Sequence, residues 1–182
     1  MLKSSDKGFT LIEVIIVIII LSIVAAITLS FMVNSMRIYT LTVNQKTLLD
    51  EGKLALERMC RDIRDARSIS SPAAGGSDNL ITFTRTNATA QDVANESITF
   101  RLNGNALEKV KASPSVTCAM ANNVSTFTIT RGAASDEITI SLTLSQTSGE
   151  NVTLQTKVYP KNLVDSSTYK RFFQNWREEL SS

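Results

Sequence analysis

The chain has 182 residues and a formal net charge of +2, with 19 Lys and Arg against 17 Asp and Glu. This near balance gives no polyanion-binding signal, so we expect no direct nucleic-acid binding. The sequence has no histidine and no HExxH, CxxC or phosphate-binding glycine loop. We therefore expect neither catalysis nor a bound metal or other cofactor.

A long apolar segment lies near the N-terminus. From Phe9 to Val33 every residue except Glu13 is uncharged. As a helix it would span roughly 37 Å, against a hydrocarbon core of about 30 Å. The segment is longer than the apolar region of a secretory signal peptide, which favours a single transmembrane span. Lys3 and Lys7 precede it against one aspartate, Asp6, which predicts a cytoplasmic N-terminus and an exported remainder.

Glu13 needs an explanation, because a charge inside a span costs about 2.5 to 3.5 kcal/mol even on the lenient insertion scale. One explanation is an uncleaved signal anchor whose Glu13 reaches the nearby headgroups. A second comes from the surrounding residues.

Residues 7–13, KGFTLIE, followed by a long aliphatic run, resemble the N-terminus of the type IV pilin superfamily, which includes pilins, minor pilins and the pseudopilins of type II secretion. The resemblance implies that residues 1–8 form a leader, removed between Gly8 and Phe9 by prepilin peptidase, a membrane aspartyl peptidase. The same enzyme would N-methylate Phe9. Glu13 would then meet the N-terminal ammonium of a subunit, often a neighbour, and a paired carboxylate costs far less to bury than a lone one.

The resemblance also implies partners: other pilin or pseudopilin subunits, an inner-membrane assembly platform with its ATPase motor, and membrane lipid. Many major pilins carry a proline in the middle of the span, whereas residues 9–33 have none. That absence predicts an unkinked helix and favours a minor pilin or minor pseudopilin. The strand layout is loosely similar to that of W-type minor pilins and J-type minor pseudopilins.

The helical pattern continues beyond the membrane as an amphipathic half over residues 34–69, so that one helix runs from Phe9 to about Ser68. Gly52 lies inside it and is expected to be a soft point costing about 1 kcal/mol. Opposite charges four residues apart are expected on its outer face. These pairs are Arg58 with Asp62 and Arg61 with Asp65.

Residues 70–163 predict a β-rich domain after a break at residues 71–79. Six runs alternate apolar and polar residues, with turns expected at residues 103–105 and 147–150. A sheet packed on the amphipathic half of the helix would bury both apolar faces, so the expected fold class is α+β, a long helix on an antiparallel sheet. This is also the pilin architecture. The runs begin at Leu80, Ser97, Ala106, Val124, Glu137 and Asn151.

Cys60 and Cys118 are the only cysteines. An oxidising compartment would allow one disulfide, which would join the helix to the sheet domain, and the alternative is two buried free thiols. Acidic residues near Asp78 and at Asp136 and Glu137 match no calcium-loop spacing and are interpreted as solvated charges.

Residues 164–182 predict a separate short amphipathic helix. It would either pack on the domain or bind a neighbouring subunit. Its apolar positions are Tyr169, Phe172, Phe173, Trp176 and Leu180.

Three hypotheses follow. The first is a structural subunit of a type IV pilus or type II secretion pseudopilus. The second is an adhesion or DNA-uptake module on a related filament. The third is a membrane-anchored exported domain unrelated to filaments, which predicts no cleavage after Gly8 and no effect of changing Glu13.

Overall fold

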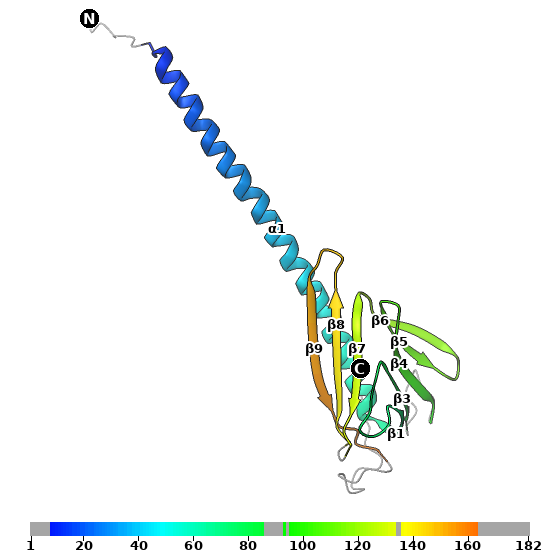
Figure 1. Cartoon of the computed structure of the whole chain (residues 1–182). Coiled ribbons are helices and arrows are strands. Elements are labelled where there is room, and N and C mark those ends of the chain that lie inside the picture. Colours follow the sequence, from blue (N-terminus) through cyan, green and yellow to red (C-terminus); the bar gives the residue numbers. More distant parts are fainter. Residues whose placement is uncertain (1–7, 86–92, 94, 134–135, 164–182) are drawn as a thin grey trace, which may run out of the picture. The chain divides into compact units, whose positions relative to one another are not determined.

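The computed structural model describes residues 8–85, 93, 95–133 and 136–163 (Figure 1). The chain divides into two compact units, residues 1–43 and 44–182. The expected leader lies outside the described residues except for Gly8. The expected C-terminal helix at residues 164–182 lies outside them altogether.

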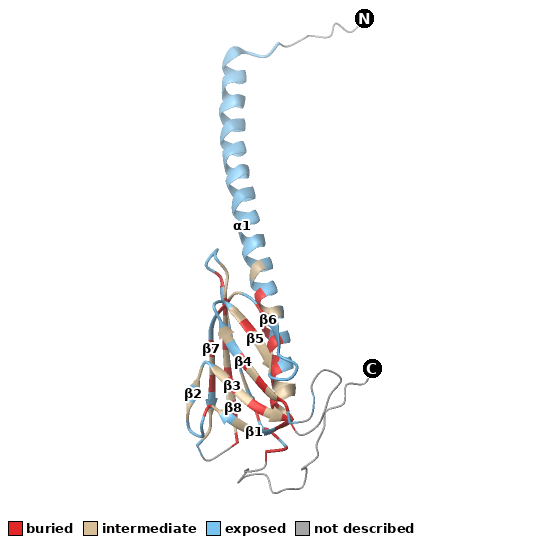
Figure 2. Cartoon of the chain, turned by 90° about the vertical axis from the view of Figure 1, so that its right-hand side faces the viewer, coloured by how far each residue is buried: buried red, intermediate tan, exposed pale blue. Residues whose placement is uncertain are grey.

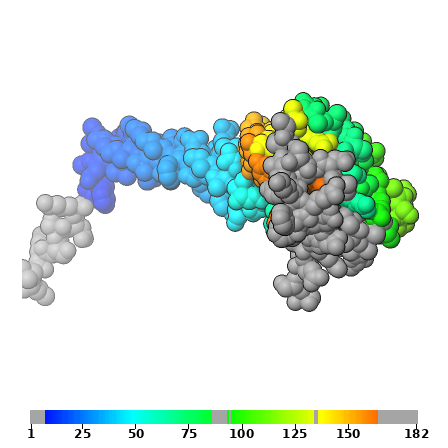
Figure 3. Space-filling model, turned by 90° about the horizontal axis from the view of Figure 1, so that it is seen from below, coloured from blue at the N-terminus to red at the C-terminus, as the bar shows by residue number. Residues whose placement is uncertain are grey.

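The first unit consists, in its described part, of the start of helix α1 (Leu11–Arg64), preceded by residues 8–10. Residues 8–43 are exposed, and the ribbon is coloured pale blue for them in Figure 2; Figure 3 shows the same part of the chain in space-filling form. By length and composition α1 is able to cross a membrane, and none of its most apolar window is buried. The helix is uninterrupted over its 54 residues, as the absence of proline predicts.

The second unit combines the rest of α1 with two antiparallel sheets. In the described residues the first sheet has the order β1-β3-β4-β5-β6 and the second has the order β2-β7-β8-β9. The predicted α+β fold with a long N-terminal helix on antiparallel strands is therefore confirmed, although two sheets replace the single one expected. The strands are β1 (Ala66–Ser71), β2 (Ser77–Asp78), β3 (Leu80–Arg85), β4 (Ser97–Asn103), β5 (Ala106–Lys111), β6 (Val116–Ala121), β7 (Val124–Arg131), β8 (Ile138–Ser145) and β9 (Asn151–Val158).

All six predicted runs form strands, and their alternation is the cause. In β3 and β8 every second side chain is buried, so one face of each sheet packs and the other meets water. Both predicted turns also form. Gly104 and Gly149 have φ values of 61° and 101°, a left-handed conformation that glycine adopts without steric cost.

The helix ends earlier than predicted, at Arg64 instead of Ser68. Residues 66–71 form β1, which pairs with β3 and places Ile69 opposite Phe83. The ladder to β3 outweighs the weak helical preference of a serine-rich segment. The amide of Lys161 donates to the carbonyl of Arg64 (2.9 Å) and satisfies one of the carbonyls left open at the helix end.

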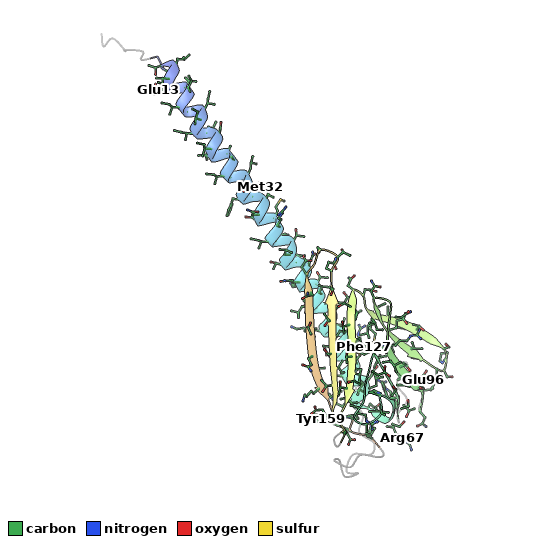
Figure 4. All side chains as sticks on the ribbon, in the orientation of Figure 1. Glu13, Met32, Arg67, Glu96, Phe127 and Tyr159 are labelled. Atoms are coloured by element: carbon green, nitrogen blue, oxygen red, sulfur yellow. The ribbon has the colours of Figure 1, made fainter. Side chains whose placement is uncertain are left out.

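One core joins α1 to both sheets. Its helical side is a stripe at three- and four-residue spacing, and the inward side chains of both sheets complete it, including Phe127 (Figure 4). The rings of Phe83 and Phe100 are in contact at an interplanar angle of 44°, with their centroids 5.6 Å apart. Each fully buried large apolar side chain contributes about 1.5 to 3 kcal/mol. The helical stripe comprises Leu48, Gly52, Ala55, Leu56, Met59 and Ile63.

Gly52 is a packing position, so the expectation of a soft point is wrong. It is buried within the helical stripe. A Cβ atom there would lie 2.7 Å from the Cδ1 of Leu154 and 2.8 Å from the Cδ1 of Leu144. The missing side chain lets α1 approach β8 and β9 closely.

Replacing Gly52 with leucine should therefore destabilise the second unit by about 1 to 3 kcal/mol, because overpacking outweighs the better helix propensity. The measurement is urea unfolding of the detergent-solubilised chain. Lys53→Leu, at the adjacent exposed position, is the control and should stay within about 0.5 kcal/mol of the parent. Equal stability of the two variants would contradict this account of Gly52.

Candidate functional site

The candidate site begins where α1 begins. Thr10 precedes the helix and accepts hydrogen bonds at its carbonyl from the amides of Glu13 (3.1 Å) and Val14 (3.3 Å). Its Oγ1 also accepts from the Glu13 amide (3.4 Å). Thr10 is therefore the N-cap of α1, with Glu13 at the third helical position. The spacing T-x-x-E is that of a capping box, a sequence signal that could have located this helix start.

The bond between Gly8 and Phe9 lies just outside the helix. Residues 8–10 are non-helical. Among the residues that the structure describes, no other group comes within 4 Å of the place where a Gly8 Cβ would lie, and Phe9 is 81% exposed. The backbone here is open to a protease, which binds its substrate in extended form.

Glu13 lies in the first turn of α1, among exposed apolar side chains (Figure 4). Leu11, Ile12 and Val14 around it are all at least 47% exposed. In a bilayer these neighbours would face hydrocarbon, where a carboxylate without a partner is costly.

The structure does not bring the two cysteines together. Cys60 is half-buried on α1, where burial raises the pKa of its thiol against smaller opposing effects of a hydrogen bond with Thr156 of β9 and of Arg64. Cys118 is exposed on β6, the end strand of the other sheet. Both thiols are free in this structure, where the Cys60 thiol contacts the second sheet and Cys118 belongs to the first. The disulfide stays a prediction for the exported protein.

Two aspartates expected on the outer helix face point inward instead. Asp62 forms ion pairs with Arg85 of β3 and with Lys109 of β5 (3.0 Å). Asp65 is buried and accepts a hydrogen bond from the Asn162 side chain (2.6 Å). The sequence pattern showed only the partners four residues away, whereas the partners of Asp62 come from β3 and β5 and that of Asp65 from the segment after β9.

The acidic residues considered for calcium have protein partners. Asp78 accepts hydrogen bonds from the Ser71 hydroxyl (3.1 Å) and the Asn79 amide (2.8 Å). Glu137 pairs with Lys157 (2.7 Å). Within the part of the chain that the structure describes, no three His, Cys, Asp or Glu side chains gather as metal ligands would.

A known family motif covers the start of α1 and the residues before it. A family model described as the prokaryotic N-terminal methylation motif matches residues 3–29. Neither curated proteins nor solved structures gave a match. The motif supports placing the chain in the type IV pilin superfamily, as a pilin- or pseudopilin-like substrate of prepilin peptidase that assembles with other pilins. It suggests a structural rather than an enzymatic role, and the apolar helix fits a membrane-anchored pilin.

The two thiols should differ in reactivity. Exposed Cys118 should react with a maleimide faster than Cys60, because burial raises the pKa of the Cys60 thiol and lowers its thiolate fraction at neutral pH. The measurement is a time course by mass spectrometry. Cys118→Ser should remove the fast phase and Cys60→Ser the slow one. Thiols that appear in the exported protein only after reduction would show that the disulfide forms there.

Proposed function

We propose that the chain is a minor pilin or minor pseudopilin, a structural subunit of a type IV pilus or a type II secretion pseudopilus. Prepilin peptidase cleaves it between Gly8 and Phe9 and N-methylates Phe9. The apolar helix then packs with the helices of other subunits, and Glu13 neutralises the N-terminal ammonium of one of them. The observation that carries the proposal is the methylation motif at the start of a long, exposed, apolar helix.

The geometry of residues 8–10 supports cleavage at this bond. The bond is non-helical and accessible, and Gly8 offers no side chain to obstruct an approaching enzyme. The Thr10 cap keeps the helix start beyond the bond, so cleavage does not require the helix to unwind.

The exposed surface of residues 9–43 supports assembly through the helix. A row of apolar side chains that is exposed throughout is stable only in lipid or against other apolar helices. Before assembly the inner membrane supplies this surrounding, with the N-terminus cytoplasmic and residues 44–182 outside the cytoplasm. During assembly a platform and its ATPase motor would transfer the subunit from the membrane to the filament. The lack of a proline in residues 9–33 favours a minor subunit.

Processing is tested first by the mass and N-terminal residue of protein recovered from cells with an active prepilin peptidase. We expect the first eight residues to be absent and Phe9 to carry one methyl group. Gly8→Val should abolish cleavage, because a β-branched side chain obstructs the bond, whereas Thr10→Ser, which keeps the N-cap, should be cleaved normally. An intact Met1 in the parent protein would favour an anchored exported domain unrelated to filaments.

Assembly is tested with Glu13→Gln, which removes the charge and keeps a capping-box side chain. We expect normal cleavage but at least about tenfold less subunit in sheared filaments, because breaking a buried ion pair costs on the order of 3 kcal/mol or more. Glu57→Gln, at an exposed position later in α1, is the control. Normal incorporation of Glu13→Gln would reduce Glu13 to a helix-capping residue.

A further inference from the structure

Two turns of the second unit are linked by a backbone hydrogen bond, and both contact α1. The first turn, between β6 and β7, contains Asn122 and Asn123, and the second is the β8–β9 turn at residues 146–150. The amide of Ser145 donates to the carbonyl of Asn123 (2.7 Å) and links them. The second turn is closed by bonds between Gln146 and Glu150 (2.8 Å) and between Gly149 and Gln146 (3.0 Å).

Each turn makes a polar contact with the first part of α1 that belongs to this unit. The Asn44 amide group donates to Glu150 Oε1 (3.2 Å) and to Ser148 Oγ (3.4 Å). Seven residues along the helix, Glu51 Oε1 accepts from the backbone amide of Asn122 (2.6 Å). The Ser148 hydroxyl donates to the other oxygen of Glu150 and holds that carboxylate in place.

Apolar packing in this part of the helix is sparse. Between residues 44 and 51 only Leu48 is buried, at 2% exposure. The other members of the helical stripe begin at Gly52 and continue to Ile63. Residues 44–51 thus place one fully buried apolar side chain in the core and add the contacts with the two turns, whereas residues 52–63 supply most of the helical stripe.

We propose that these two turns form a latch that holds residues 44–51 of α1 against the sheets, and that opening the latch releases this segment while residues 52–63 stay packed. The released segment keeps its helical conformation on average, but without tertiary contacts its hydrogen bonds open transiently more often. It adds about 12 Å to the length of α1 beyond the packed part. The latch therefore sets how much of α1 is free for packing with neighbouring helices. The proposal does not depend on cleavage at Gly8, so it can fail without affecting the proposed function.

Glu150 is suited to this role at neutral pH. The Ser148 hydrogen bond, its own backbone amide and Asn44 lower the pKa of its carboxyl group, and burial opposes them. Glu150 therefore stays ionised to lower pH than a free glutamate, and while it is ionised both of its oxygens are acceptors.

The test is hydrogen exchange, followed by mass spectrometry, of the full chain in detergent. Asn44→Ala and Glu51→Ala each remove one side of the latch and raise helix propensity, so faster exchange cannot come from a weaker helix. We expect exchange in residues 44–51 to rise about fivefold in each variant and roughly twentyfold in the double variant. Exchange in residues 52–63 and in the strands should not change.

Lys46→Ala is the matched control, since Lys46 is exposed in the same segment, and it should exchange like the parent. Unchanged exchange of residues 44–51 in the double variant would overturn the latch. Equal acceleration throughout α1 and the strands would also overturn it, because it would mean that the whole unit opens together.

Discussion

Helix α1 has to pair its own backbone amide and carbonyl groups both in the part that is apolar on every side and in the part that has only one apolar face. An uninterrupted helix pairs its interior amide and carbonyl groups internally, so the same backbone is stable where its side chains are apolar on every side and where only one face is apolar. This requirement explains why the 54 residues contain no proline and only one glycine. That glycine, Gly52, lies where the backbone must come close to β8 and β9.

The charged and polar contacts of α1 lie at the two ends of its packed part. Asn44 and Glu51 hold the beginning, while Asp62 and Asp65 are paired with strand and C-terminal residues near the end. The stretch between Gly52 and Met59 is packed by apolar atoms, and only Gly52 fits where α1 meets β8 and β9. A shift of one residue would turn Asp62 and Asp65 away from their partners and leave buried charge unpaired, so these pairs define the register of helix on sheets.

The features that the sequence predicted are those carried by local patterns. Alternation predicted six strands, and the KGFTLIE stretch predicted the methylation motif that the family model matches, because each signal lies within a few neighbouring positions. β6 was missed because VTCAMA has little polar and apolar contrast and is exposed over most of its length, and β1 because its charged start resembled a continuing helix. The division into two sheets and the partners of Asp62 could not be predicted, since alternation shows which face is buried but not which strand lies beside it. The Thr10 cap could have been found from its spacing with Glu13.

The position of the Thr10 cap has a consequence for the processed chain that we propose. Cleavage after Gly8 leaves only Phe9 and Thr10 ahead of the first helical residue, so the new ammonium is tethered within about 7 Å of the helix start. The aligned peptide dipoles already give that end of α1 a partial positive charge of roughly half a proton. Processing thus places a positively charged ammonium next to the positive end of the helix dipole. N-methylation does not remove this charge, because a methylated amine stays protonated. Each processed helix would carry an electrostatic strain at its tip that a carboxylate can relieve, so that a neighbouring helix presenting Glu13 becomes favourable only after the leader has gone.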